Sequence, residues 1–133
     1  MFDVLTEENY LVKLTRGDYA PFEITAKNDD GSDYMFQVDD VVRIAIYKKG
    51  NMKDLKLSKD VTVTEESLSV SIELFSNETK IDDIISKPTD YWYEVTLNPD
   101  TDKARTILGY DDVTGAKIFR LLPEGGDGNA NNN

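Results

Sequence analysis

The feature of this sequence that most restricts its fold is a regular alternation of apolar and polar residues. The alternation is complete over residues 67–74, where the apolar positions are Leu68, Val70, Ile72 and Leu74. Successive side chains of a β-strand point to opposite faces of a sheet, whereas a helix would scatter these four positions around its axis. Residues 67–74 are therefore predicted to form a strand that packs its apolar face on a core.

Similar patterns recur along the chain and predict a protein built mainly of strands. Turns rich in Gly, Asp and Asn separate them. The turn at 28–33 is the clearest, because Asp30-Gly31 supplies the positive φ of a tight turn. The predicted strands cover residues 10–15, 22–27, 34–36, 41–47, 55–63, 67–74, 91–97, 104–108 and 118–122.

One segment breaks the alternation. The apolar residues at 81, 84 and 85 have helical spacing, and Ser76 or Asn77 can cap a first helical turn. One short helix is therefore predicted near residues 77–85. About eight short strands, with turn signals roughly every 8–12 residues, are typical of an all-β, antiparallel, immunoglobulin-like β-sandwich. A small barrel is the alternative.

The 133 residues divide into three segments by composition. Residues 10–122 are predicted to form the β-sandwich domain, a usual length for one domain. Residues 1–9 are an acidic N-terminal arm without the apolar stretch of a signal peptide. Residues 123–133 are a Gly/Asn-rich tail, predicted to be flexible because it has almost no apolar surface to bury. No stretch is apolar enough to cross a membrane, so synthesis in the cytoplasm is expected.

The composition excludes most catalytic chemistry. The chain has no His and no Cys, which removes nucleophile–histidine pairs, disulfides and thiolate metal sites. Its net charge of −11 disfavours contact with nucleic acid and with anionic membranes. A carboxylate pair for glycoside hydrolysis is the remaining acid–base chemistry, but the acidic residues lie mostly in predicted turns. We therefore expect no enzyme and no cofactor.

The acidic turn at 28–33 is the candidate for a metal site. Asp29, Asp30 and Asp33 could offer carboxylate oxygens to Ca²⁺. The EF-hand register fails, because placing Gly31 at its sixth position puts Ala26 where an acid is required. Since Asp is also common in turns for conformational reasons, no metal is predicted there, and these three residues stand only as candidates.

Two groups of residues are candidates for a binding surface. In the aromatic group, Tyr91 and Tyr93 share one face of the predicted strand and Trp92 takes the other. Trp is enriched at protein interfaces, so Trp92 and its tyrosine neighbours are candidate interface residues. Lys48 and Lys49 begin the most basic stretch of the chain and could contact an acidic neighbouring subunit.

Several short motifs, taken in order, resemble a known group of proteins. They are Leu14-Thr15-Arg16-Gly17-Asp18, Asp30-Gly31, Val38-Asp39-Asp40-Val41, the alternating strand at 68–74, Glu78-Thr79, Tyr91-Trp92-Tyr93-Glu94-Val95, Thr106-Ile107 and Ile118-Phe119. Over roughly residues 10–122 this order resembles structural proteins of tailed phages and prophages of Gram-positive bacteria. It is similar to the N-terminal immunoglobulin-like domain of baseplate upper proteins.

The resemblance implies a virion protein that binds and does not catalyse. It would be an adaptor or decoration module on the baseplate, head fibre or capsid surface. Its partners would be copies of itself, as a trimer, and other virion proteins. The sequence departs from the baseplate pattern because no coiled coil or helical arm follows the domain, which favours a one-domain adaptor, head-fibre base or decoration protein.

A carbohydrate-binding or adhesin-like β-sandwich is the alternative. In that case Trp92 and a neighbouring tyrosine would form a platform for a sugar ring. The exposure of Trp92 distinguishes the two functions, because a sugar platform requires an open, flat face with an exposed Tyr beside the Trp.

Overall fold

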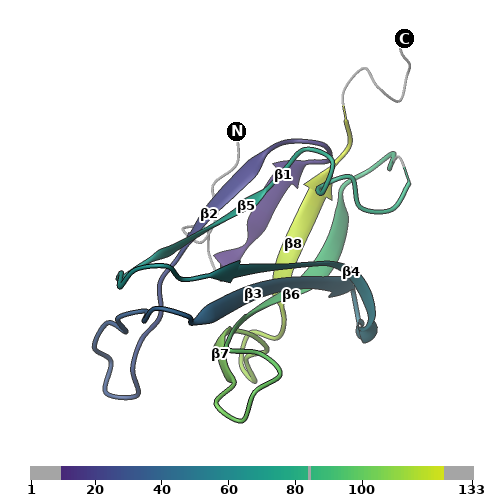
Figure 1. The fold of residues 1–133 in the computed structure, drawn as a ribbon. Helices are drawn as coiled ribbons and strands as arrows, with labels where there is room; N and C mark the ends of the chain where they lie inside the picture. Colours follow the sequence, from purple (N-terminus) through teal and green to yellow (C-terminus); the bar gives the residue numbers. More distant parts are fainter. Residues whose placement is uncertain (1–9, 84, 125–133) are drawn as a thin grey trace.

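The computed structural model describes residues 10–83 and 85–124. This part of the chain is mostly β-strand, and its strands form two sheets (Figure 1). The strands are β1 (Val12–Thr15), β2 (Ala20–Ile24), β3 (Val41–Lys48), β4 (Asn51–Thr62), β5 (Val70–Leu74), β6 (Thr89–Leu97), β7 (Arg105–Leu108) and β8 (Lys117–Leu122). The predicted all-β class is confirmed.

The larger sheet has the order β1-β8-β6-β3-β4, and β7 pairs with β6 as well. One edge of β6 is shared, since β8 pairs with Thr89 to Tyr93 and β7 pairs with Val95 to Leu97. β2 and β5 form the second sheet. The prediction of purely antiparallel pairing is wrong at one place, because β1 lies parallel to β8. These two strands come from opposite ends of the domain, so no tight turn between them imposes an antiparallel direction.

Both sheets turn apolar faces to one core. The alternation predicted for β6 is confirmed, because Tyr91, Tyr93 and Val95 are buried. The largest fully buried side chains come from strands of both sheets and from the loop before β3. They are Tyr93, Phe22, Phe36, Phe119, Leu14, Ile24, Ile44, Ile46, Ile72, Leu74, Leu121 and Val12.

The strand predicted over 67–74 is shorter in the structure. β5 begins at Val70, and Leu68, predicted to line the core, is 49% exposed. Ser67 instead forms an isolated bridge with Phe36, whose backbone N–H donates to the Ser67 carbonyl over 2.8 Å. Residues 34–36, predicted as a strand, contribute only this bridge. The bridge between Ser67 and Phe36 therefore precedes β5, and Leu68 lies between this bridge and the first residue of the strand.

The helix predicted near 77–85 is a turn in its described residues. The Glu78 and Thr79 N–H groups both donate to the Phe75 carbonyl, over 2.8 and 3.2 Å, and among the described residues no further helical hydrogen bond follows before the bend at 82–83. Arg16 explains this difference. Its guanidinium donates to the carbonyls of Ile81 and Asp82 over 3.0 and 2.5 Å, so these acceptors face Arg16 and not a following helical turn.

The predicted arm at 1–9 and most of the predicted tail, residues 125–133, lie outside the described residues. Glu124, within the predicted tail, is described, and its carboxylate pairs with Arg16 over 2.5 Å. Within residues 10–83 and 85–124, no helix is long and apolar enough to cross a membrane.

Candidate functional site: a groove between two strand edges

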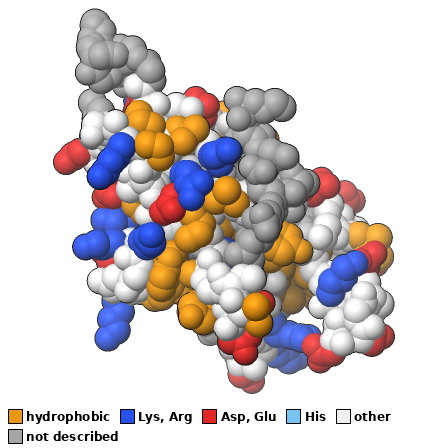
Figure 2. Space-filling view, turned by 180° about the vertical axis from the view of Figure 1, so that it is seen from behind, with side chains coloured by type: hydrophobic (Ala, Val, Ile, Leu, Met, Phe, Trp, Pro, Cys, Tyr) orange, Lys and Arg blue, Asp and Glu red, His pale blue; other side chains and the backbone are white. Residues whose placement is uncertain are grey.

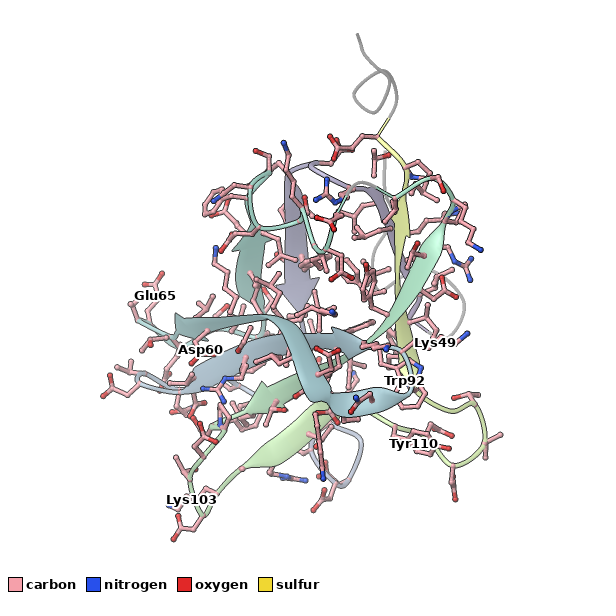
Figure 3. All side chains as sticks on the ribbon, turned by 90° about the vertical axis from the view of Figure 1, so that its right-hand side faces the viewer. Lys49, Asp60, Glu65, Trp92, Lys103 and Tyr110 are labelled. Atoms are coloured by element: carbon pink, nitrogen blue, oxygen red, sulfur yellow. The ribbon has the colours of Figure 1, made fainter. Side chains whose placement is uncertain are left out.

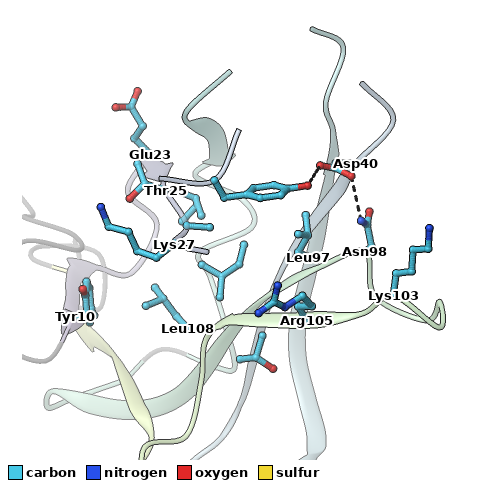
Figure 4. Close-up of a pocket in the computed structure, with 15 residues that line it drawn as sticks. Tyr10, Glu23, Thr25, Lys27, Asp40, Leu97, Asn98, Lys103, Arg105 and Leu108 are labelled. Carbon is cyan, nitrogen blue, oxygen red and sulfur yellow. Dashed lines mark hydrogen bonds between the residues drawn. The ribbon is translucent and has the colours of Figure 1, made fainter. Parts of the chain in front are cut away.

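A groove with a volume of about 800 Å³ opens beside β2 and β7 (Figure 4). We call it the edge groove, because its walls are the consecutive residues 23–27 and 105–108. A strand that turns its face toward a cavity contributes every second residue, since its side chains alternate. A segment that contributes consecutive residues turns its edge toward the cavity. The groove therefore separates two backbone edges.

Within the described residues, β2 and β7 each have one edge without a strand partner, although beyond β2 the Tyr34 N–H donates to the Ala26 carbonyl over 3.0 Å and Lys27 forms a bridge with Asp33. Among the described residues, β7 pairs only with β6, and β2 pairs only with β5. An edge strand presents a row of backbone N–H and C=O groups that can pair with an added strand. Many proteins bind extended peptides in this way, with backbone hydrogen bonds for affinity and side-chain pockets for specificity. The edge groove has the geometry of such a site.

The edge groove has an apolar interior and a rim of mixed charge, because Glu23 and Asp40 line it together with three cations and Lys27 is paired with Asp33. Its apolar lining residues are Ile24, Ala26, Tyr34, Leu97, Ile107 and Leu108, and its cations are Lys27, Lys103 and Arg105. Arg105 pairs with Asp29 over 2.5 Å, whereas the Lys103 side chain makes no ion pair within the described residues. Figure 2 shows the molecule from behind, with Lys and Arg side chains among the acidic ones and apolar side chains between them. The net charge of −11 thus coexists with locally basic surface.

A hydrogen-bonded corner fixes one end of the groove. Asp40 accepts hydrogen bonds from the Tyr34 hydroxyl over 2.7 Å and from the Asn98 amide over 3.1 Å, both drawn in Figure 4. The Gln37 N–H donates to the same carboxylate over 2.9 Å. Asn98 in turn accepts from the Val41 N–H and so holds the start of β3. The Asp40 carboxylate therefore has a structural role, because it holds this corner together.

These contacts shift two pKa values in opposite directions. Burial alone would raise the pKa of Asp40, but the hydrogen bonds from Gln37, Tyr34 and Asn98 outweigh it and lower the pKa below its usual value. Burial, together with the hydrogen bond to Asp40, raises the pKa of Tyr34 to about 12. The corner therefore keeps an ionised carboxylate beside a protonated phenol across the neutral range.

Asp40 should make the stability of the fold depend on pH in the acid range. Its pKa is lower in the folded chain than in the unfolded chain, so ionised Asp40 stabilises the fold above about pH 4. That contribution is lost as the pH falls through the folded-state pKa. In urea unfolding measured between about pH 2 and 7, Asp40→Asn should be less stable at pH 7 and should lose less stability on acidification than the unaltered chain.

The matched control is Asp39→Asn. Asp39 is an exposed neighbour with a positive φ of 74°, a conformation that Asn tolerates, and its carboxylate makes no hydrogen bond among the described residues. Its substitution should leave the pH profile unchanged. Equal profiles for Asp40→Asn and the unaltered chain would contradict the role assigned to Asp40.

The three candidate calcium ligands bind to different partners. Asp30 accepts from the Ser32 N–H and hydroxyl, Asp33 pairs with Lys27, and Asp29 pairs with Arg105. Within residues 10–83 and 85–124, no group of three or more acidic side chains has an arrangement that could hold a metal ion. The turn at 28–33 is instead closed by its own hydrogen bonds, as the Asn28 N–H donation to the Ser32 carbonyl over 2.8 Å shows.

Of the three aromatic candidates, only Trp92 lies on the outer face of the sheet. Tyr91 and Tyr93 are 2% and 1% exposed, so neither ring can contact a partner in this structure. Trp92 is half-buried on the opposite face, beside Tyr110, which is 70% exposed (Figure 3). The two ring centres lie 6.5 Å apart with an angle of 62° between the ring planes. The pair therefore does not share the flat plane of a sugar platform.

Lys48 and Lys49 are exposed at the end of β3, far from the edge groove. Figure 3 shows Lys49 and Lys103 on opposite sides of the molecule. Lys49 borders a shallow hollow together with Lys87 and Arg120. Arg120 is already paired with Asp90 over 2.6 Å, and this contact is the main cause that lowers the pKa of Asp90. The structure does bring the basic candidates close to Trp92, because Lys48 pairs with Tyr91 in the β3–β6 ladder and Figure 3 shows Lys49 near Trp92, but this region is separate from the edge groove.

Sequence patterns did not indicate the edge groove. Lys27 is more than 70 positions before Lys103 and Arg105 in the sequence, and only the folded chain brings it to the same groove. The predicted strand at 104–108 identified one wall, but the alternation says nothing about whether a strand has a partner on both sides. Comparison of the chain with protein-family models, with curated proteins and with solved structures found no match.

Proposed function

We propose that this protein is a structural adaptor of a phage virion that works by binding other subunits. The edge groove carries the proposal, because two unpaired strand edges facing one cavity fit an added extended segment. The occupant would be an extended segment of a neighbouring subunit with apolar residues for the interior and an acidic residue for Lys103, the rim cation that makes no ion pair within the described residues. The virion setting follows from the resemblance to baseplate upper proteins.

Binding is a better account of the groove than catalysis. Asp40, the acidic group at its corner, is held by three hydrogen bonds and keeps a lowered pKa. A general acid or base at neutral pH would need a carboxyl whose pKa is raised toward the working pH. Tyr34, with its pKa raised to about 12, is a hydrogen-bond donor in that range and not a base.

The carbohydrate-binding alternative has weaker support. It required Trp92 and a neighbouring tyrosine on an open, flat face, but Tyr91 and Tyr93 are buried. Tyr110 is exposed, yet its ring is tilted by 62° from that of Trp92. The outer face near Trp92 suits an additional protein contact better than a stacked sugar.

Site-specific cross-linking tests the proposed function. Because the chain has no Cys, the variant Ile107→Cys carries one thiol, in the wall of the groove, for a benzophenone label. In assembled particles, irradiation should link this position to a virion subunit, and mass spectrometry should identify an extended peptide as the linked site. Flanking genes for portal, capsid or tail proteins are expected as well.

Lys53→Cys is the matched control. Lys53 is exposed in β4 near its first residue, at the opposite end of the β3–β4 pair from Val41 and the groove corner. It should give no cross-link to the same peptide. Absence of the protein from particles, a metabolic gene context, or equal cross-linking from both positions would overturn the proposal.

A further inference from the structure

We propose that the outer face of β6 binds an arginine side chain of a partner protein, held between the Glu94 carboxylate and the rings of Tyr47, Trp92 and Tyr110. We call these four residues the Glu94 cluster. None of them lines the edge groove, so the inference goes beyond the proposed function and does not depend on what fills the groove. It rests on how the cluster is placed, on the missing partner of Glu94, and on the positions of the nearby cations.

The β3–β6 ladder places the cluster on one face of the sheet. Trp92 and Glu94 are two positions apart in β6, so both point away from the buried side of that strand. Tyr47 lies directly opposite Trp92 in β3, and cross-strand partners project from the same face. Tyr110 adds a third ring, whose centre lies 6.5 Å from that of Trp92 with 62° between the ring planes. Rings set at an angle can each turn a face toward one cation, which ring faces attract.

Glu94 is the acidic group of the cluster, and it has no partner in the described part of the chain. Its carboxylate is half-buried and makes no hydrogen bond or ion pair within residues 10–83 and 85–124. Burial raises the pKa of Glu94, and no positive group offsets this rise. Taking a carboxylate partly out of water costs free energy unless it gains a partner. The cluster is therefore complete only with a cation.

Gly109 leaves one side of this carboxylate uncovered. A side-chain carbon at this position would lie 3.6 Å from Glu94 Oε2 and only 2.6 Å from the Thr106 methyl group. Because glycine has no side chain, the end of β7 does not cover Glu94 with a group of its own. A side chain from another molecule can approach there.

Arg43 lies on the same face of β3, but two carboxylates already hold it. It pairs with Asp60 over 2.7 Å and with Asp100 over 3.0 Å. Burial raises the pKa of Tyr47, the charge of Glu94 raises it further, and Arg43 lowers it. Arg43 is thus within electrostatic reach of the cluster, but its donors face the other two acids.

Lys48 and Lys49 lie at the end of β3, and Figure 3 shows Lys49 near Trp92. Lys48 pairs with Tyr91 in the ladder, so the end of β3 lies on one side of Trp92 and Glu94 lies on the other. Neither lysine makes an ion pair with Glu94 within the described residues. An incoming cation can therefore reach Glu94 without displacing a cation of this chain.

The combination of rings and one carboxylate favours arginine over lysine. A guanidinium is planar, so it can stack on a ring face and donate two parallel hydrogen bonds to a carboxylate. Trp, Tyr and Arg are also the residues that contribute most of the binding energy at protein interfaces. The net charge of −11 would in addition attract a basic partner surface.

A titration with the peptide acetyl-Gly-Arg-Gly-amide tests the proposal. Trp92 is the only tryptophan, so its fluorescence reports directly on the cluster. The fluorescence should change saturably, and NMR amide shifts should be confined to residues 45–47, 92–94 and 109–110. The same peptide with citrulline, an uncharged analogue of arginine, should not bind, and the peptide with lysine should bind more weakly. Equal binding of the lysine or the citrulline peptide, or no saturable change, would overturn the proposal.

Two variants and a matched control locate the site. Glu94→Gln should weaken binding of the arginine peptide about tenfold, because the charge-assisted hydrogen bonds are lost. Tyr110→Ala removes a ring that is 70% exposed, so it should weaken binding without disturbing the fold. The control Asp112→Asn removes the same charge from an exposed carboxylate in the loop that carries Tyr110, and it should leave binding unchanged. If Asp112→Asn weakened binding as much as Glu94→Gln, the attraction would be general and the assigned site wrong, whereas the cross-linking result at the edge groove could still stand.

Discussion

Replacing Phe119 by alanine should lower the free energy of unfolding by about 3–5 kcal/mol, the usual cost of removing a buried aromatic ring. Phe119 is fully buried in β8, pairs with Val12 on one side and Tyr91 on the other, and packs its ring edge-on against Tyr93 at 6.5 Å. The cavity would form where β1, β8 and β6 meet. Denaturant unfolding followed by circular dichroism measures the loss.

Phe75→Ala is the control with the same chemical change. Phe75 is 48% exposed, stacks on Tyr19 with ring centres 6.0 Å apart, and lies under the Lys59 ammonium at 4.3 Å. These surface contacts predict a loss of about 1 kcal/mol or less. If Phe75→Ala destabilised the chain as much as Phe119→Ala, the assignment of the core would be wrong.

The second large effect is expected at Arg16. Its side chain is almost completely buried and donates to the carbonyls of Lys80, Ile81 and Asp82 and to the Glu124 carboxylate. Arg16→Ala would leave these buried acceptors without a partner, and breaking a buried ion pair from one side costs about 3–5 kcal/mol. Urea unfolding should show this loss, and hydrogen exchange should speed up at residues 79–83.

Arg43→Ala is the control for loss of a guanidinium. Arg43 also pairs with two carboxylates, Asp60 and Asp100, over 2.7 and 3.0 Å, but on the surface of the sheet. Exposed ion pairs contribute about 1 kcal/mol or less.

Arg16→Lys should recover only part of the stability lost in Arg16→Ala, because an ammonium group cannot reproduce the planar set of donors. Equal losses for Arg16→Ala and Arg43→Ala would contradict the structural role of Arg16.

Arg16-Gly17-Asp18 shows how much one motif can and cannot reveal. The sequence predicts a Gly-centred turn, and Gly17 has the expected positive φ of 90°. The structure adds that hydrogen bonds to Thr79 hold this turn in place. The Gly17 N–H donates to the Thr79 hydroxyl over 3.0 Å, and that hydroxyl donates to the Asp18 carbonyl over 2.8 Å. Thr79 is more than 60 positions away, so no local pattern could indicate the contact.

The failed helix prediction has the same origin. Residues 77–85 carry helical spacing, but helix formation requires the carbonyls of one turn to accept from N–H groups of the next. The backbone carbonyls of residues 80–82 instead accept hydrogen bonds from the Arg16 guanidinium. A short segment gains little from its own helical hydrogen bonds, so a buried guanidinium from another strand decides its conformation.

The sequence by itself determined the position of most strands and the alternation of side chains within them, because that alternation is a local property of an extended backbone. It placed Tyr91 and Tyr93 on one face of the strand and Trp92 on the other, and the structure showed that the tyrosine face is the buried one. Only the tertiary structure decided which strands are neighbours, that β1 runs parallel to β8, and that β2 and β7 leave two edges free around one groove. These features depend on pairing between segments far apart in the chain, and the alternation within one strand contains no information about its partner.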